Sequence, residues 1–237
     1  MPQYRANDDV LQFLYVEQEL TIAVSTVETG MAILQNNHLY RRNEFPFLLL
    51  LSTGLERVLK IVQHLIVFED ESHYRPVRHI HDLEALRGWV LANCFTPDYL
   101  TRPNMPADRD YLANDPMLIA TFKVLSAFAL ADRYLYMDAI ADPNLPDAAD
   151  RWPSRQWAKL ENVFIDQVGG VWPIEGIEDR HRYASRQLVG VIERLMRIVG
   201  RMFAFRRFGD TGSQLSVRLS HFTRMDEQEF GTVTYKV

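Results

Sequence analysis

The sequence predicts an all-α fold, a bundle of helices, on three observations. Apolar residues recur at the spacing i, i+3, i+4, i+7 through most of the 237 residues, which is the period of one buried helix face. The alternation of strand and helix patterns that builds a parallel sheet is absent. Hydrophobic residues make up 47% of the chain, which is enough for a sizeable core, so we expect one ordered helical domain.

Residues 8–39 and 45–68 form the first two expected helices. Asp8 or Asp9 begins the first, because an aspartate side chain can accept the free N–H groups of a first helical turn. The second helix has a clear amphipathic pattern. Its apolar stripe consists of Leu55, Val58, Leu59, Val62, Leu65 and Ile66.

A third helix is expected to begin at His81 or Asp82. The next stretch, 95–110, contains three prolines and therefore predicts an ordered loop. A fourth helix then runs from Pro116 to about Ile140. Proline suits the first turn of a helix, because no intrahelical hydrogen-bond donor is needed there.

Two more helices, 154–168 and 179–208, follow a second loop rich in proline and aspartate at 141–153. The remaining residues contain a short apolar segment, 215–222. They also contain a candidate terminal strand, 231–237, in which apolar residues alternate with threonines.

Charge is unevenly distributed along the chain. The net charge of −5 argues against a general polyanion-binding protein. Residues 180–207 nevertheless carry eight arginines and one acid, Glu193. Four arginines recur away from the apolar stripe of the 179–208 helix and are expected to point outward: Arg186, Arg194, Arg197 and Arg201. Because arginine forks match phosphate oxygens, this face predicts an RNA-binding surface; the alternative is a solvated face paired with acids elsewhere.

Arg57 and His64 form the candidate catalytic pair. Seven positions along a helix leave the two side chains only about 20° apart, on the face opposite the apolar stripe of helix 45–68. A guanidinium can stabilise the extra charge of a reacting phosphoryl group, and an imidazole can transfer protons near neutral pH. The pair therefore suits metal-independent RNA cleavage by attack of a ribose 2′-hydroxyl. The alternative is a solvated face on which one of seven histidines lies by chance.

No cofactor or metal site is predicted. His73, His79 and His81 lie close in sequence, but no HExxH pattern or second ligand cluster completes a metal site. A metal-binding or small-molecule-binding bundle that uses these three histidines is a lesser alternative. The sequence has no glycine-rich phosphate loop. Cys94 is the only cysteine, which excludes a disulfide within one chain.

The sequence predicts neither a membrane span nor a signal peptide. Its longest apolar run, 45–51, is too short to cross a bilayer. The first nine residues have no apolar core after a basic start. A cytoplasmic location is therefore expected.

Two short motifs and their order resemble the HEPN superfamily of compact helical bundles. Residues 55–60 read Leu-Glu-Arg-Val-Leu-Lys, with an acid-x-x-x-Lys pattern made by Glu56 and Lys60, and residues 81–83 read His-Asp-Leu at a helix start. Arg182-Tyr183 before a long amphipathic helix also resembles the end of some members. The resemblance implies one domain over 1–237, with a core of 8–93 and 179–208, an insertion at 95–176 and a C-terminal tail at 209–237.

The resemblance implies two kinds of function. Many HEPN proteins are dimeric ribonucleases that use an Arg-x4–6-His motif at the dimer cleft, whereas others are partners of nucleotidyltransferases or interaction modules. This sequence has two formal matches, Arg57-x6-His64 and Arg75-x5-His81. Catalytic members usually carry the motif on a later helix, where this chain has Arg180-His181 and no histidine at the required spacing.

The leading expectation is a homodimeric, HEPN-like endoribonuclease of a defence or toxin system. Arg57 would stabilise the phosphoryl charge and His64 would act as general acid or base. RNA would be the substrate, and a cognate antitoxin or a nucleotidyltransferase would be a further partner. The alternative is a non-catalytic HEPN-like module that binds a partner protein or a nucleotide.

Overall fold

The computed structural model describes residues 3–36, 43–71, 81–142, 149–167 and 177–236. In these residues it contains helices and no strand, so the expected all-α class is confirmed. The candidate terminal strand is wrong for residues 231–236, and Val237 lies outside the described residues. The backbone of residues 233–235 bonds to the Gln35 side chain of α1 instead of to a neighbouring strand. Gln35 Nε2 donates to Val233 O at 2.6 Å, and Tyr235 N–H donates to Gln35 Oε1 at 2.9 Å.

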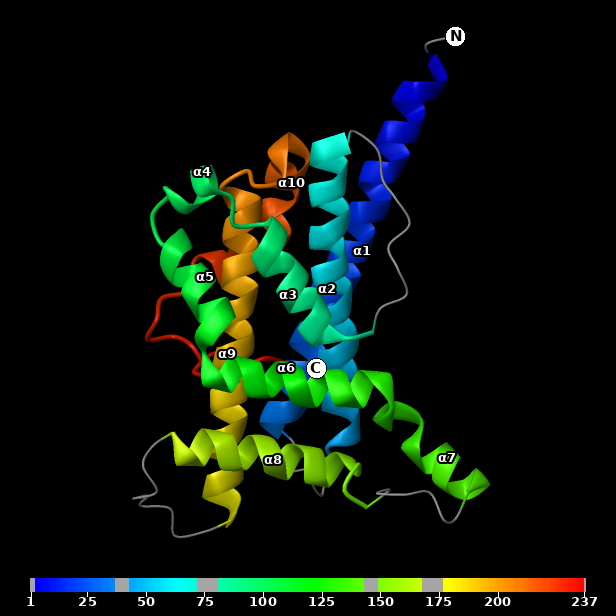
Figure 1. The fold of residues 1–237 in the computed structure, drawn as a ribbon, viewed down its shortest axis with the longest axis vertical. Helices are drawn as coiled ribbons and strands as arrows, with labels where there is room; N and C mark the ends of the chain where they lie inside the picture. Colours follow the sequence, from blue (N-terminus) through cyan, green and yellow to red (C-terminus); the bar gives the residue numbers. More distant parts are fainter. Residues whose placement is uncertain (1–2, 37–42, 72–80, 143–148, 168–176, 237) are drawn as a thin grey trace.

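The helices α1 (Gln3–Asn36) and α2 (Phe45–Glu71) form a long antiparallel pair. Helix α1 begins before Asp8 and Asp9, so the expected start at these residues is wrong. Figure 1 shows its N-terminal part extending beyond the rest of the bundle.

Two glycines allow α1 and α2 to approach closely. A Cβ at Gly54 would lie 2.7 Å from Val27 Cγ2, and one at Gly30 would lie 2.8 Å from Leu51 Cδ2. Both distances are shorter than a normal carbon–carbon contact, so these positions exclude a side chain. The glycines thus set the spacing of the helix pair.

The expected start of the third helix is confirmed at α3 (Leu83–Asn93), where Asp82 is the N-cap and accepts the Ala85 N–H at 3.1 Å. The same carboxylate accepts the Ser126 hydroxyl at 2.7 Å, and Ser126 Oγ accepts the Leu83 N–H at 3.1 Å. Ser126 belongs to α6 (Pro116–Leu130), so this cap also joins two helices.

The expected loop at 95–110 is wrong. It contains α4 (Pro97–Leu100), and α5 (Met105–Asn114) also begins within it. The prolines do not interrupt these helices, because Pro97 and Pro106 lie in the first turn, where a missing N–H is tolerated. Thr96 caps α4 by accepting the Tyr99 N–H.

The helix expected over 116–140 is broken after α6. A 3₁₀ turn, η1 (Asp132–Tyr134), separates it from α7 (Leu135–Ala141). Asp132 is buried and accepts the Nε–H of Arg151 at 2.8 Å, which holds the turn against the chain before α8 (Pro153–Asp166). In Figure 1, α8 crosses the lower end of the bundle and α7 projects away from it at the lower right.

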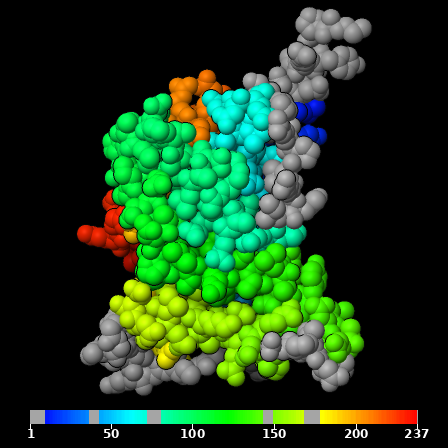
Figure 2. Space-filling model, viewed as in Figure 1, coloured from blue at the N-terminus to red at the C-terminus, as the bar shows by residue number. Residues whose placement is uncertain are grey.

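The residues of 95–176 that the structure describes share the core of the flanking helices. Leu118, Phe122, Trp157 and Phe164 belong to the same buried cluster as Phe47 of α2. Figure 2 shows α3, α5, α6 and α8 as one continuous surface.

The helix α9 (Ile177–Ala204) is followed by α10 (Gly209–Leu215), η2 (Ser216–Leu219) and α11 (Ser220–Thr223). Two glycines of α9 face these C-terminal residues. Gly200 faces Thr223 and Leu219, and Gly190 would place a Cβ 3.3 Å from Gly231 N. The C-terminal residues of this chain therefore fold back along α9.

Candidate functional site

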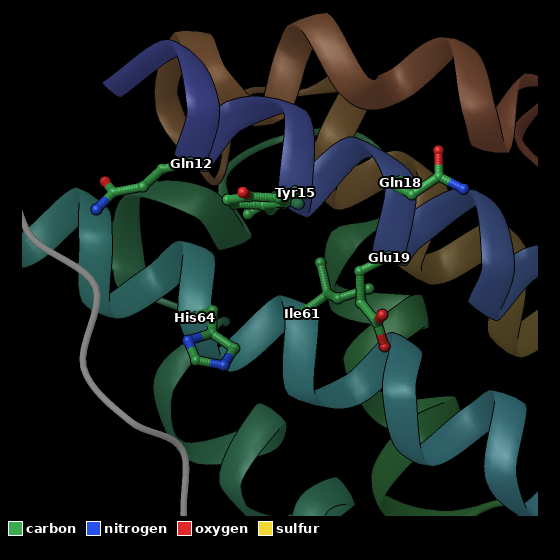
Figure 3. A pocket seen from close by; sticks show the side chains of 7 residues that line it. Gln12, Tyr15, Gln18, Glu19, Ile61 and His64 are labelled. Carbon is green, nitrogen blue, oxygen red and sulfur yellow. The ribbon is translucent and has the colours of Figure 1, made fainter. Parts of the chain in front are cut away.

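A cavity of about 460 Å³ opens between α1 and α2 (Figure 3). Its walls come from two turns of α1 and one turn of α2. They consist of Gln12, Tyr15, Val16, Gln18 and Glu19 on α1, and Ile61 and His64 on α2. The lining combines apolar side chains with one carboxylate, one imidazole and two amides.

His64 lies in the wall of this cavity. Partial burial, and secondarily the nearby ammonium of Lys60, lower the pKa of its imidazole below the usual 6.5. Its neutral form therefore persists to lower pH than that of a free histidine. A neutral imidazole can accept a proton or a hydrogen bond.

Arg57 lies at the edge of the same site without lining the cavity. Its Nε is 3.5 Å from Oε1 of Glu19, and both side chains are partly exposed. Glu19 does line the cavity, so it connects Arg57 to the space beside His64. The structure thus places both predicted residues beside α1, with the guanidinium already paired to a carboxylate.

The surface of α1 beside the cavity is apolar and exposed. Val10, Leu14 and Tyr15 have exposed fractions of 58%, 47% and 70%. These residues, with Leu11 and Ile22, span an arc of about 140° around the helix at 100° per residue. The buried residues Leu20, Ala23 and Val27 lie on the opposite side, so α1 has apolar residues on two faces, and the described residues cover only one of them.

The residues that carry the HEPN resemblance meet in space. Buried Glu56 accepts a hydrogen bond from Lys60 Nζ at 2.6 Å, and His81 Nδ1 lies 3.0 Å from the same carboxylate oxygen. Because His81 immediately precedes the Asp82 cap, this cluster ties the middle of α2 to the start of α3. The geometry gives the motif a clear structural role.

Three of the four candidate RNA-binding arginines of α9 contact other parts of this chain. Arg201 Nη1 donates to both carboxylate oxygens of Asp108 on α5, at 2.8 and 3.0 Å. Arg197 donates to Met225 O at 3.1 Å and pairs with Glu227. The guanidinium of Arg194 lies 4.0 Å from the ring centroid of Tyr111.

The expectation that the Arg197 side chain points outward into solvent is therefore wrong, because this residue is only 3% exposed. The physical reason is that residues 225–230 fold back over this face of α9. The sequence pattern of α9 alone could not reveal that cover. Arg186, by contrast, is exposed.

The metal-site alternative finds no support in the described residues, where no three His, Cys, Asp or Glu side chains gather in a way that could hold a metal ion. His73, His79 and Arg75 lie outside the described residues, so the second Arg-x-His match has no described geometry. In the part of the chain that the structure describes, no helix has the length and apolar character that a membrane span requires.

Comparison of the chain with protein-family models, curated proteins and solved structures found no match.

Proposed function

We propose that this chain is a cytoplasmic, HEPN-like binding module without catalytic activity, and that it docks an amphipathic helix of a partner protein on α1. The observation that carries the proposal is the exposed apolar face of α1, formed by Val10, Leu11, Leu14, Tyr15 and Ile22. We call these residues the docking face. The cluster of Glu56, Lys60 and His81 supports the HEPN-like part of the proposal.

The shape of the site favours a helix as the occupant. A helix that has apolar residues on two opposite faces normally buries both, yet the described residues cover only one of these faces of α1. Val10, Leu11, Leu14 and Tyr15 lie together on this face, and Ile22 lies about two turns further along the helix. A partner helix with apolar residues at the same spacing would match them. The cavity beside Tyr15 can take a large side chain of that partner.

Charge also favours a protein over RNA at this site. The carboxylate of Glu19 neutralises Arg57, and Glu17 pairs with Arg218. The arginines Arg194, Arg197 and Arg201 are held against α5 and the C-terminal residues, away from α1. Among the residues that the structure describes, little uncompensated positive charge is left beside His64 to attract a phosphate backbone.

Replacing Leu14 by Glu is expected to weaken binding of the partner strongly. Burying each half-exposed apolar side chain contributes about 1 kcal/mol to docking, and a buried glutamate adds a desolvation cost, so affinity falls by at least about tenfold. The measurement is chemical cross-linking in the native host, followed by binding of the identified protein to the purified chain.

The matched control is Ile140→Glu, which places the same charge at an apolar residue that is 76% exposed on α7, away from α1. It should leave partner binding unchanged. Sedimentation of the purified chain tests self-association, and a dimer that Leu14→Glu dissociates would identify the partner as a second copy. Equal binding by the wild type and Leu14→Glu would remove the docking face from the proposal.

A metal-independent endoribonuclease is the second candidate, and one observation favours it. His64 borders the cavity, and the pKa of its imidazole is lowered, so the neutral form that a general base requires is favoured. Arg57 lies at the edge of that cavity, paired with Glu19 of its lining. Displacement of Glu19 by a substrate phosphate would free the guanidinium to stabilise the charge of the reacting group.

Under this second function, His64→Ala should reduce cleavage of single-stranded RNA by about 100- to 10,000-fold in the presence of a metal chelator. His221→Ala, at an exposed histidine of α11, is the control and should retain activity. Thermal unfolding checks that both variants fold. If His64→Ala cleaved RNA as fast as the wild type, this site would be excluded as the catalytic site. If the wild type cleaved no RNA, the binding module would remain the proposed function.

A further inference from the structure

Residues 225–236, which we call the strap, contact α9 through an acidic and an aromatic side chain. Arg197 pairs with the carboxylate of Glu227, and Arg194 Nη1 lies 3.9 Å from Oε2 of the same carboxylate. The guanidinium of Arg197 also lies 4.4 Å from the ring centroid of Phe230. This helix face therefore binds an acid and, three positions later, an aromatic ring.

The charge of Glu227 belongs to this recognition. Burial acts to raise the pKa of its carboxyl, but the hydrogen bond from Arg197 and the charges of Arg194 and Arg201 outweigh that effect, so the pKa is lowered. The side chain is nevertheless 61% exposed. An acid at this position is thus selected by the arginines of α9 and not by the need to fill a core.

Two further side chains outside the strap bind its backbone. Gln35, at the end of α1, donates to Val233 O at 2.6 Å and accepts the Tyr235 N–H at 2.9 Å. One residue of a neighbouring parallel strand bonds to a C=O and an N–H two residues apart in the same way. Glu193 of α9, which is fully buried, accepts the Gly231 N–H at 2.6 Å. These groups match a polypeptide backbone.

The strap passes α9 at a position that only glycine fits. Gly231 adopts a φ of 75°, and a Cβ there would lie 2.5 Å from Arg186 O. A segment that binds in this place therefore needs glycine directly after its aromatic residue.

The space along α9 is larger than the strap fills. A hollow of about 430 Å³ lies beside Phe230 and Arg186, and its lining includes Tyr111 and Asp115. A larger aromatic side chain in place of Phe230 can occupy part of this hollow. The carboxylates of Asp115 and the buried Glu193 disfavour a nucleic-acid backbone here.

We infer that the strap occupies a peptide-binding groove and that the groove takes an acidic, aromatic segment of a partner polypeptide when the strap is displaced. The α9 groove is formed by Gln35, Tyr111, Glu193, Arg194 and Arg197. The partner segment carries an acid, an aromatic residue three positions later, and then glycine. The strap is accordingly a built-in competitor that closes the groove. This groove is separate from the docking face, so its test is independent of the proposed function.

Fluorescence anisotropy of a labelled synthetic peptide of residues 225–236 tests the groove in the full chain. In the wild type the strap competes at an effective concentration on the order of millimolar, so the added peptide binds weakly. Gly231→Val in the chain prevents its own strap from seating and should tighten peptide binding by at least about tenfold. Gln228→Val adds the same side chain at an exposed position of the strap and should bind like the wild type.

A second variant, Phe230→Ala, removes the ring of the strap without adding bulk and should also tighten peptide binding. Thermal unfolding shows which variants fold, and Phe230→Ala decides the test if Gly231→Val does not. Leu14→Glu on the docking face should leave peptide binding unchanged, which keeps this result distinct from the proposed function.

Changes in the peptide test what the groove selects. Glu227→Gln in the peptide should weaken binding by at least about tenfold through the lost ion pair. Asp226→Asn removes the same charge at an exposed residue and should bind like the unchanged peptide. Phe230→Trp should bind about 3- to 10-fold more tightly, because the larger ring enters the hollow. A strap with only a structural role would gain nothing from that change.

Five results would overturn the inference. They are no peptide binding to either loosened variant at millimolar concentration, equal affinity of the wild type and both variants, a Glu227→Gln peptide that binds like the unchanged one, a Phe230→Trp peptide that binds no more tightly, or a ten-nucleotide RNA that binds Gly231→Val more tightly than the peptide.

Discussion

Replacing Arg201 by Ala is expected to lower the free energy of unfolding by about 3–5 kcal/mol, because the change leaves a buried charge without its partner. Arg201 donates to both oxygens of Asp108, whose side chain is only 5% exposed. Burial raises the pKa of Asp108, and the hydrogen bond and charge of Arg201 oppose that rise. Without the guanidinium, the carboxylate must either stay ionised in an apolar setting or take up a proton.

Chemical denaturation of the wild type and Arg201→Ala measures this loss. The control is Arg186→Ala, on the exposed face of the same helix, which should change stability by less than about 0.5 kcal/mol. The double variant Asp108→Leu with Arg201→Met should recover most of the loss, because an apolar pair of similar volume replaces the ion pair. If Arg201→Ala matched Arg186→Ala in stability and yet weakened RNA binding, Arg201 would belong to an RNA-binding surface.

Replacing Glu193 by Gln is expected to remove a stability change of about 3 kcal/mol between pH 4.5 and pH 8. Burial raises the pKa of this carboxyl from 4.5 to about 7, and hydrogen bonds from Gly231 and Tyr235 limit the rise. Because the pKa is raised in the folded state, its contribution to stability is fully present below pH 4.5 and is lost as the pH rises through about 7. A shift of about 2.5 units corresponds to about 3 kcal/mol.

Glutamine reproduces the protonated carboxyl at this position. Its amide oxygen can accept the Gly231 N–H in place of Glu193 Oε2, and its NH₂ can donate to the Tyr235 oxygen, which in the wild type donates its hydroxyl to Glu193 Oε1. The two proteins should therefore be equally stable near pH 4.5, with Glu193→Gln increasingly the more stable up to about pH 8. Glu178→Gln, at an exposed acid of the same helix, should show no such trend. A difference that stays constant with pH would contradict the raised pKa.

Most helices could be predicted from the sequence because their signals are local. The stripe from Leu55 to Ile66 located α2, and the cap at Asp82 located the start of α3. The two errors have different causes, one local and one not. Prolines at 97 and 106 suggested a loop although they occupy first helical turns. The break at Asp132 depends on Arg151, nineteen residues further along the chain, and the pattern of 116–140 contains no sign of it.

The candidate sites likewise combine features that a single helix determines with features that only packing between helices determines. That Arg57 and His64 share one side of α2 follows from helix geometry alone. The cavity at His64 exists only because α1 packs beside α2, and Gly30 and Gly54 set that spacing. The hollow beside Arg186 on α9 was not expected, because it needs Tyr111 of α5 and Phe230 of the C-terminal residues, far apart in the sequence, to meet beside α9.

The sequence by itself determined the helical class, most helix positions and which residues share a helix face, because each depends on a repeat of 3.6 residues along one segment. Only the tertiary structure decided which faces stay exposed. It buried Arg197 under the C-terminal residues, neutralised Arg57 with Glu19, and left the apolar side of α1 and the side chain of Arg186 open. Those outcomes depend on contacts between residues far apart in the chain, which no local pattern encodes.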